Sequence, residues 1–413
     1  MSDSIDIALL GRKLGHSLSP EIHEYLGSYG YVLHPLEPNE LDPFFERTDF
    51  RGLNVTIPYK LDVVKYCAEL SDTAKRIGCV NTIVRRADGS YYGDNTDYFG
   101  FSHMAKSAGI GFKDKKVLIL GTGGASLTAH LVASDQGARE VVKIGRNLEN
   151  NYQNIDRHSD AEVIINCTPV GMYPNNGERL IDLDIFPLCE GVLDMIYNPA
   201  RTALLLDAED RGIRCANGLT MLVAQAAKSA EYFRGTEKKE VDIDDIVHRI
   251  SRAQKNVVLI GMPGCGKSTA AALLCERLKR ETLDTDAMIV ERAGKPIPEI
   301  FADEGEEHFR RLESICVNDA CKMAGKVIAT GGGAILRPEN RDALRGNSFV
   351  IFLKRAISDL DRKGRPLSTG KSALEEMYEK RLPLYRATAD AEVDVCETKE
   401  ETLESIIKAL EQM

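Results

Sequence analysis

The chain has 413 residues, which predicts two or three domains at roughly 150 residues each, every one large enough to bury its own core. Its 53 Lys and Arg against 63 Asp and Glu give a net charge of −10, which disfavours a nucleic-acid-binding protein with a basic face. Hydrophobic and charged fractions of 43% and 28% exclude a mostly disordered chain, a coiled coil and a collagen-like repeat. No apolar run approaches the roughly 20 residues that cross a bilayer, so no membrane partner is expected.

Two further features indicate a cytoplasmic protein. The first residues place Asp3 and Asp6 where a signal peptide needs basic side chains, and they lack its long apolar stretch. The ten cysteines are scattered without a C-x-x-C pair, so neither a zinc site nor a disulfide framework is indicated. We expect reduced thiols in the cytoplasm.

Short β-branched runs alternate with helical patterns, which predicts an α/β fold with parallel sheets. The expected strands are Ile5 to Leu10, Val117 to Leu120, Glu162 to Asn166, Val192 to Met195, Val257 to Ile260, Val327 to Ala329 and Phe349 to Leu353. A helix over Phe99 to Ala108 places a secondary boundary near residue 100. The main boundary falls between Arg234 and Lys255, where the sequence becomes charged and loses strand signal.

The first glycine-rich loop follows the strand Val117 to Leu120 and precedes an apolar helix. In this context backbone N–H groups meet the pyrophosphate of a dinucleotide. The candidate cofactor-binding residues are Gly121, Gly123, Gly124, Ala125 and Ser126. Ser126 stands where the general pattern has its third glycine, so a plain tight turn remains an alternative. Arg146 ends the next strand, where an NAD site has an acidic residue, and this favours NADP(H).

Four polar clusters lie in the first 100 residues and three more follow later. Together they resemble the shikimate dehydrogenase family over roughly residues 5–250. The clusters are Ser17 to Pro20, Asn54 to Lys60, Val80 to Thr82, Gly93 to Asp97, Asn166 to Met172, Asp194 with Tyr197 and Pro199, and Gly218 to Gln225.

This resemblance implies that Ser17 and Ser19 bind the substrate carboxylate. It implies further that the substrate hydroxyls are held by Asn54, Thr56, Asn81 and Gln225, and that Lys60 and Asp97 are the catalytic pair. The chemistry is sensible without the family, because hydride delivery to a ketone creates alkoxide charge that an ammonium stabilises and protonates. A carboxylate beside the lysine orients it and favours its charged form.

The first part also departs from the family pattern. Of a phosphate-binding run similar to N-R-T-x-x-R, only Arg146 is retained. The segment Asn147 to Ala161 has little helical periodicity and is too short for a helix and a further strand, which predicts an abridged nucleotide domain. His16 is interpreted as a loop-positioning residue.

The second glycine-rich loop is a full G-x-x-x-x-G-K-S motif between the strand Val257 to Ile260 and a helical pattern. Successive N–H groups cradle the phosphates, the lysine reaches the β- and γ-phosphates, and the serine hydroxyl ligates Mg²⁺. The candidate ATP-binding residues are Gly261, Gly264, Gly266, Lys267, Ser268 and Thr269. Cys265 needs only to be small.

Motifs after this loop resemble the shikimate kinase family over roughly residues 255–413. The resemblance implies that Asp286 holds the substrate hydroxyls and takes the proton of the attacking one, and that Asp284 assists Mg²⁺ through water. It implies that the shikimate carboxylate is bound by Arg310 and Arg381, with Gly332 and Gly333 allowing close backbone approach, and that Arg365 neutralises the transferring phosphoryl group from a lid. The lid segment Asp359 to Arg365 is short, and Arg362 is a guess for adenine stacking.

The sequence therefore predicts a two-domain dehydrogenase, an α/β substrate domain plus a Rossmann-like NADP domain, followed by a P-loop kinase domain with a parallel sheet. The expected bounds are 1–99, completed by about 219–250, then 100–218 and 255–413. The expected substrates are 3-dehydroshikimate and shikimate, with NADP(H), ATP and Mg²⁺ as cofactors. Two alternatives remain: an NAD-preferring quinate or shikimate dehydrogenase fused to a kinase for another small polyol acid, and a non-catalytic ligand sensor.

Overall fold

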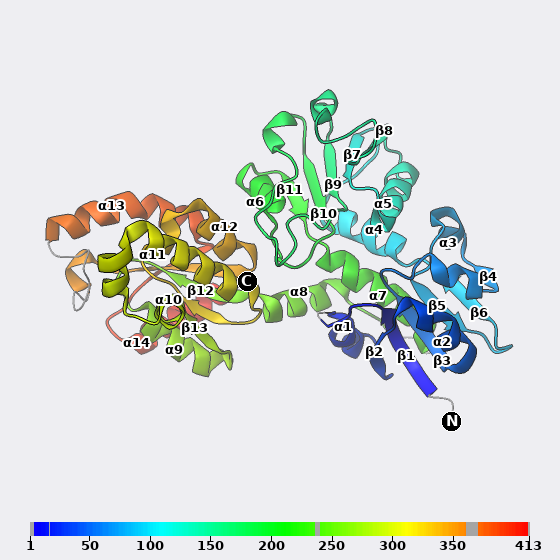
Figure 1. Cartoon of the computed structure of the whole chain (residues 1–413), viewed down its shortest axis with the longest axis horizontal. Helices are drawn as coiled ribbons and strands as arrows, with labels where there is room; N and C mark the ends of the chain where they lie inside the picture. Colours follow the sequence, from blue (N-terminus) through cyan, green and yellow to red (C-terminus); the bar gives the residue numbers. More distant parts are fainter. Residues whose placement is uncertain (1–3, 16, 236–239, 361–370, 412–413) are drawn as a thin grey trace. The chain divides into compact units, whose positions relative to one another are not determined.

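The computed structural model describes residues 4–15, 17–235, 240–360 and 371–411. The chain divides into two compact units, whose helices and strands are labelled in Figure 1. The first unit comprises Met1–Pro169, Leu180–Tyr197 and Asp207–Ile250. The second comprises Val170–Arg179, Asn198–Leu206 and Ser251–Met413. In the part of the chain that is described, no helix is long and apolar enough to span a membrane.

The N-terminal part of the first unit is built on a six-stranded mixed sheet of order β2-β1-β3-β5-β6-β4. Strand β1 pairs in parallel with β2 and β3, whereas β5 is antiparallel to β3 and β6. The elements are β1 (Ser4–Gly11), α1 (Ser19–Leu26), β2 (Tyr31–Pro35), α2 (Leu41–Arg47), β3 (Asp49–Val55), β4 (Glu69–Leu70), α3 (Asp72–Ile77), β5 (Thr82–Arg85) and β6 (Tyr91–Asp94).

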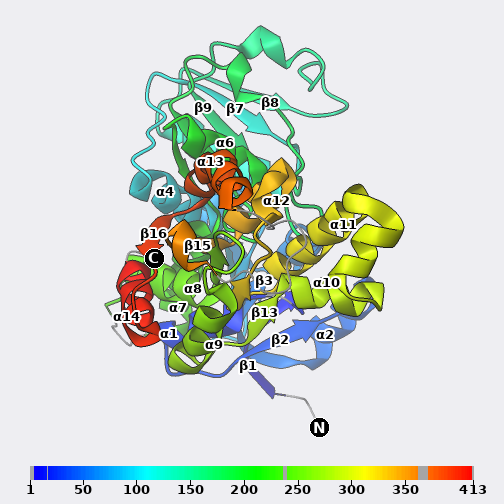
Figure 2. The same cartoon turned by 90° about the vertical axis from the view of Figure 1, so that its left-hand side faces the viewer.

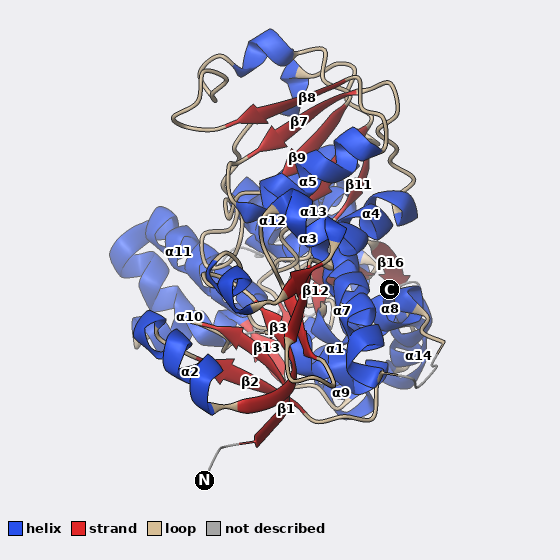
Figure 3. Cartoon of the chain, turned by 90° about the vertical axis from the view of Figure 1, so that its right-hand side faces the viewer, coloured by secondary structure: helices blue, strands red, loops and turns tan. Residues whose placement is uncertain are grey.

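A second sheet of the first unit has five parallel strands in the order β11-β10-β9-β7-β8, and Figure 3 shows β7, β8 and β9 side by side. Its elements are α4 (Asp97–Ser107), β7 (Lys116–Leu120), α5 (Gly124–Asp135), β8 (Glu140–Ile144), β9 (Val163–Asn166), β10 (Gly191–Asp194), α6 (Ala203–Asp210) and β11 (Arg214–Ala216). Parallel strands are usually joined by a crossover helix, but between β8 and β9 the chain forms only a short 3₁₀ turn, Ile155–His158. This agrees with the sequence, whose pattern predicts no full helix in this segment.

Two helices after the second sheet return to the first one. Helix α7 (Leu219–Arg234) and helix α8 (Ile243–Gln254) form a buried apolar cluster with α1, to which Ile246 and Ile250 of α8 contribute. The charged segment between Arg234 and Lys255 thus contains an amphipathic helix with one buried face.

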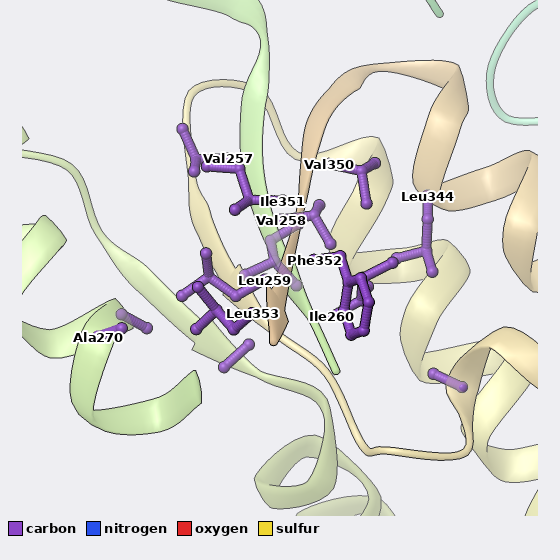
Figure 4. Packing of buried hydrophobic residues seen from close by; sticks show 14 of the residues in the cluster. Val257, Val258, Leu259, Ile260, Ala270, Leu344, Val350, Ile351, Phe352 and Leu353 are labelled. Atoms are coloured by element: carbon purple, nitrogen blue, oxygen red, sulfur yellow. The ribbon is translucent and has the colours of Figure 1, made fainter. Parts of the chain in front are cut away.

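The second unit has a five-stranded parallel sheet of order β13-β14-β12-β15-β16. Its central strands β12 (Asn256–Ile260) and β15 (Ser348–Lys354) are almost wholly apolar, as expected for a sheet covered on both faces, and Figure 4 shows their side chains packed together. The other strands are β13 (Thr282–Asp284), β14 (Val327–Ala329) and β16 (Ala391–Asp394).

In the described part of the second unit, six helices lie around this sheet, and α9 and α14 lie side by side (Figure 2). They are α9 (Lys267–Leu278), α10 (Thr285–Ala293), α11 (Ile297–Lys322), α12 (Pro338–Gly346), α13 (Lys371–Thr388) and α14 (Lys399–Leu410). Helix α11 kinks at Gly305, whose φ of 81° is in the left-handed region.

The segment Asn198–Leu206 is attached to the second unit mainly through Arg201. The Arg201 backbone N–H donates to the Gly346 carbonyl at 2.7 Å. Its side chain donates to the carbonyls of Arg345 and Ser348, both at 2.7 Å, and pairs with Asp390 at 3.0 Å. In Val170–Arg179, the Tyr173 hydroxyl donates to the carbonyl of Cys321 at 3.1 Å.

Candidate active sites

The first candidate site is centred on Lys60 and Asp97. The Lys60 Nζ donates to Asp97 Oδ2 at 2.6 Å, and both side chains are mostly buried, 28% and 14% exposed. Asp97 is the first residue of α4, and the Lys60 carbonyl accepts from the backbone N–H of Val80, which fixes the lysine beside the sheet. The structure therefore brings together two residues that are 37 positions apart in the sequence.

An amide network holds the Asp97 carboxylate in place. Asn81 Nδ2 donates to Asp97 Oδ1 at 2.9 Å, and Asn81 Oδ1 accepts from the backbone N–H of Thr96 at 2.8 Å. The Thr96 hydroxyl lies 3.4 Å from Gln225 Oε1 on α7. Asn81 and Gln225, both predicted from the motifs, thus lie in one cluster with Lys60 and Asp97.

The remaining predicted substrate residues lie on neighbouring elements. Ser17 and Ser19, at the start of α1, have their hydroxyls 3.1 Å apart. Asn54 is the penultimate residue of β3, and its Oδ1 accepts from the Tyr31 hydroxyl at 2.9 Å. Burial raises the pKa of Tyr31, and a hydrogen bond with Ser19 opposes this rise. The Tyr31 hydroxyl therefore connects Ser19 with Asn54. Thr56 follows β3, and its backbone N–H donates to the Leu10 carbonyl of β1 at 2.9 Å.

The dinucleotide loop begins where β7 ends. Gly121 has a φ of 109°, and a Cβ there would lie 3.2 Å from the Cys167 backbone, so a side chain is disfavoured on both counts. Gly124, Ala125 and Ser126 form the first turn of α5. The Ser126 hydroxyl is buried and donates to the Gly123 carbonyl at 2.7 Å, so this side chain closes the loop from within.

Arg146 lies at the same edge of this sheet. The Gly121 N–H donates to the Ile144 carbonyl at 2.8 Å, which joins the loop to the end of β8 two residues before Arg146. Arg146 is exposed. Burial raises the pKa of Tyr152 while the Arg146 charge opposes it, so the two side chains are close.

The second candidate site is a cavity of about 310 Å³ at the carboxyl ends of the P-loop sheet. Gly261, Gly264 and Gly266 all have positive φ. The buried Lys267 Nζ donates to the carbonyls of Gly261 and Met262, both at 3.0 Å. The cavity is lined by Pro263, Gly264, Gly266, Lys267, Ser268, Thr269, Asp284, Asp286, Thr330, Gly332 and Arg355.

Ser268 and Asp284 form the candidate metal position. The Ser268 hydroxyl donates to Asp284 Oδ2 at 2.9 Å, and Asp284 Oδ1 accepts from the Asp286 N–H at 2.9 Å. Among the described residues no three His, Cys, Asp or Glu side chains gather as a complete ligand set. One hydroxyl and a nearby carboxylate fit Mg²⁺, which takes most of its remaining ligands from water and phosphate oxygens.

The residues implied for the phosphate acceptor converge on Gly331 to Gly333. Arg381 Nη1 donates to the Gly332 carbonyl at 3.0 Å. A Cβ on Gly333 would collide with the Arg310 guanidinium, and one on Gly331 would lie 2.5 Å from Asp286 Oδ1. Arg310 pairs with the buried Glu313 at 2.8 Å, and burial raises the pKa of Glu313 against the opposing charge of Arg310.

Several side chains in these clusters carry no assignment from the sequence. Tyr31, Thr96 and Ser229 hold Asn54 and Asn81, and Glu313 and Arg355 belong to the second site. Thr96 and Glu313 are part of motifs that the sequence singled out, whereas Tyr31, Ser229 and Arg355 lie outside any of them. His16, Arg362 and Arg365 fall outside the described residues.

Comparisons with known proteins match two parts of the chain. The shikimate kinase family model matches residues 263–411, and that of the shikimate dehydrogenase substrate binding domain matches residues 9–83. A shikimate dehydrogenase (NADP(+)) from Clostridium beijerinckii is 34% identical over 245 residues, which are 55% of this chain and 90% of the relative.

Two solved structures are similar to 60% of this chain and 98% of their own. One is a chorismate mutase/shikimate 5-dehydrogenase fusion protein from Clostridium acetobutylicum, with 35% identity and a TM-score of 0.55. The other is a quinate dehydrogenase from Corynebacterium glutamicum in complex with NAD, with 25% identity and a TM-score of 0.53. Both family resemblances drawn from the motifs are confirmed. The chain is therefore an enzyme of two parts, which belongs to the shikimate dehydrogenase family and carries a C-terminal shikimate kinase domain.

Proposed function

We propose that the first unit reduces 3-dehydroshikimate to shikimate with NADPH, and that the second phosphorylates shikimate to shikimate 3-phosphate with ATP and Mg²⁺. The observation that carries the proposal is the Lys60–Asp97 pair, 2.6 Å apart within a network that contains Asn81 and Gln225. The two reactions support each other, because the product of the first is the substrate of the second.

In the reduction, Lys60 supports the developing negative charge on the ketone oxygen. NADPH, when bound, supplies the hydride that adds to the carbonyl carbon. The Lys60 ammonium donates a hydrogen bond and then a proton to that oxygen, which completes the alcohol. Asp97 orients the ammonium and favours its charged form. Ser17 and Ser19 bind the carboxylate, and the hydroxyls are held by Asn54, Thr56, Asn81 and Gln225.

In the phosphorylation, Asp286 accepts the proton of the attacking hydroxyl. The new oxygen–phosphorus bond forms as the bond from the γ-phosphorus to the ADP oxygen breaks, and Lys267 offsets the charge on the phosphates. Arg310 and Arg381 bind the carboxylate of the acceptor, and Gly332 and Gly333 let it approach the backbone. Ser268, with Asp284 through water, would hold Mg²⁺, which supplies further positive charge at the phosphate oxygens.

The choice of NADP over NAD rests on Arg146. Its guanidinium follows β8 at the edge where the dinucleotide loop lies, and it suits a 2′-phosphate. Because a quinate dehydrogenase bound to NAD has a similar fold, the fold alone does not separate the two cofactors. Comparing NADPH with NADH turnover on 3-dehydroshikimate does: faster turnover with NADH would replace this part of the proposal by the quinate or shikimate alternative.

One incubation tests the whole proposal. The intact chain is given 3-dehydroshikimate, NADPH and MgATP, and the products are identified by mass spectrometry. We expect NADP⁺, ADP and shikimate 3-phosphate. If shikimate accumulated and was not phosphorylated, shikimate would not be the phosphate acceptor of the second unit. If both substrates bound without turnover, the ligand sensor would be favoured.

A further inference from the structure

Two residues lining the P-loop cavity, Thr330 and Arg355, belong to neither the loop motif nor the acceptor motifs, and Arg355 is the charged one of the two. It follows β15 directly, at the carboxyl edge of the sheet. At the same edge Asp284 is the last residue of β13, and Thr330 is the first residue after β14. Because all five strands are parallel, this edge collects the ends of neighbouring strands around one site. The order and direction of the strands therefore place Arg355 at the cavity, although it belongs to no sequence motif.

The backbone at this position is fixed against the phosphate loop. Strand β15 pairs with β12, with Phe352 opposite Ile260, the residue before the loop. A Cβ on Gly261 would lie 2.6 Å from the Leu353 carbonyl oxygen, so the two chains touch where the loop begins. Arg355 is two residues further on and starts from a position set by the sheet.

The charges around Arg355 leave its guanidinium available to an anion. The side chain is half-buried, and it forms no ion pair or hydrogen bond with any residue of the described ranges. The preceding Lys354 instead pairs with Asp394 of β16 at 3.0 Å. Two successive cations therefore differ: one is neutralised by a neighbouring strand, and the other faces the cavity that contains Lys267.

The strand order indicates which part of the substrates Arg355 faces. Asp286 and Gly331 to Gly333, which serve the acceptor, follow β13 and β14 on one side of β12. Arg355 follows β15 on the other side. The γ-phosphate must point toward the acceptor, so the opposite side is occupied by the nucleotide.

We infer that Arg355 binds the phosphates that ADP and ATP share, as a second cation beside Lys267. A planar guanidinium can donate two parallel hydrogen bonds to phosphate oxygens, and a half-buried one binds them more strongly than one fully in water. The inference rests on the proposed kinase function for its nucleotide, but it makes no use of the acceptor.

The test is the dissociation constant of MgADP, measured by calorimetry on the full-length chain. We expect Arg355→Ala to weaken binding about 10- to 100-fold, the effect of one strong charge-assisted contact, and Arg355→Lys to recover part of it. Lys354→Ala is the matched control, because it removes the adjacent cation that pairs with Asp394. It should leave the dissociation constant within about twofold of the wild type.

Two further readings separate this inference from the proposed function. The KM for shikimate should be unchanged in Arg355→Ala while the KM for MgATP rises. Equal MgADP affinity in Arg355→Ala and wild type would overturn the inference, as would a wild-type chain that does not bind MgADP. A wild-type chain that binds MgADP and does not phosphorylate shikimate would overturn the proposed acceptor, while the comparison of variants would still decide the role of Arg355.

Discussion

Lys60 and Lys267 are the cations that we propose for the two reactions, and they are held in different ways. Lys60 pairs with a carboxylate, whereas Lys267 donates to two carbonyls of its own loop. We predict that Lys60→Ala lowers the rate of 3-dehydroshikimate reduction at least about 100-fold and leaves phosphorylation of supplied shikimate intact, because a general acid contributes that much. Lys267→Ala should have the reverse effect.

The two rates are followed as NADPH oxidation and ADP release on the same preparation. Lys75→Ala serves as a control, because this exposed lysine of α3 pairs with Asp72 three residues earlier and lies outside both candidate sites. If either variant at Lys60 or Lys267 lost both activities while keeping its native melting curve, the two sites would not be independent.

The buried His23, which lies beside Tyr31, should make the stability of the first unit depend on pH. It is 1% exposed and stacks on Tyr31 with ring centroids 3.9 Å apart. Burial lowers the pKa of His23 from 6.5 to about 3. Below pH 6.5 the unfolded chain therefore binds a proton that the folded chain does not, so the free energy of unfolding falls as the pH drops from 6.5 toward 3.

We predict that this one residue costs about 2 kcal/mol of stability between pH 7.5 and pH 5, where about 1.5 pH units lie below the unfolded pKa. The measurement compares unfolding of wild type and His23→Phe at the two pH values. The variant should lose less stability, and replacement of the exposed His248 by Phe should have no such effect. The same pH dependence in all three proteins would contradict the prediction.

At this scale the sequence predicts residues that belong to contiguous motifs and misses those that act from other elements. Asn54, Asn81 and Asp97 could be placed because each lies in a polar cluster. Tyr31 and Ser229 contact the same Asn54 from β2 and α7, and neither lies in a motif that the sequence analysis assigned. Their partnership depends on the fold, which brings residues 175 positions apart within hydrogen-bonding distance.

At the scale of elements, all seven strands expected from β-branched runs are confirmed within one or two residues at each end. Strand β5 was not among the expected strands, and its antiparallel pairing with β3 and β6 departs from the parallel sheets that the sequence predicted. The missing helix between β8 and β9 was predicted, since the fifteen residues from Asn147 to Ala161 have little helical periodicity and are too few for a helix and a further strand.

The segment Asn198–Leu206 supplies an element-scale prediction. Arg201 is 18% exposed and its partner Asp390 is 23% exposed. Removing the guanidinium would leave the carbonyls of Arg345 and Ser348 without this donor and Asp390 without its cation. We predict that Arg201→Ala destabilises the second unit by about 2–4 kcal/mol.

The matched control is Arg179→Ala, in the other segment of the same unit. Arg179 pairs with Asp342 at 3.0 Å but is 39% exposed, so its loss should cost no more than about 1 kcal/mol. The stability of both variants is measured by urea unfolding, with kinase activity as the readout of the folded second unit. A smaller effect for Arg201 than for Arg179 would show that Asn198–Leu206 contributes little to the second unit.

At the scale of the whole molecule, each unit contains a separate set of site residues. Among the described residues, the groups proposed for reduction all belong to the first unit and those proposed for phosphorylation to the second. Shikimate is an anion, and a chain of net charge −10 offers no general attraction that would retain it between the two reactions. The gain from fusion should therefore be a modest rise in local concentration.

This leads to a prediction about the lag before shikimate 3-phosphate appears from 3-dehydroshikimate. An equimolar mixture of full-length Lys60→Ala and Lys267→Ala chains keeps one active copy of each site but never on the same chain. If shikimate leaves the first site for bulk solution and is bound again, the mixture and the intact chain must first build up the same free concentration, because that concentration sets the rate of the second reaction. We therefore expect equal lags at matched site concentrations, measured by rapid quenching and mass spectrometry. A lag that is absent only in the intact chain would show that shikimate passes directly from one site to the other, and the prediction would be wrong.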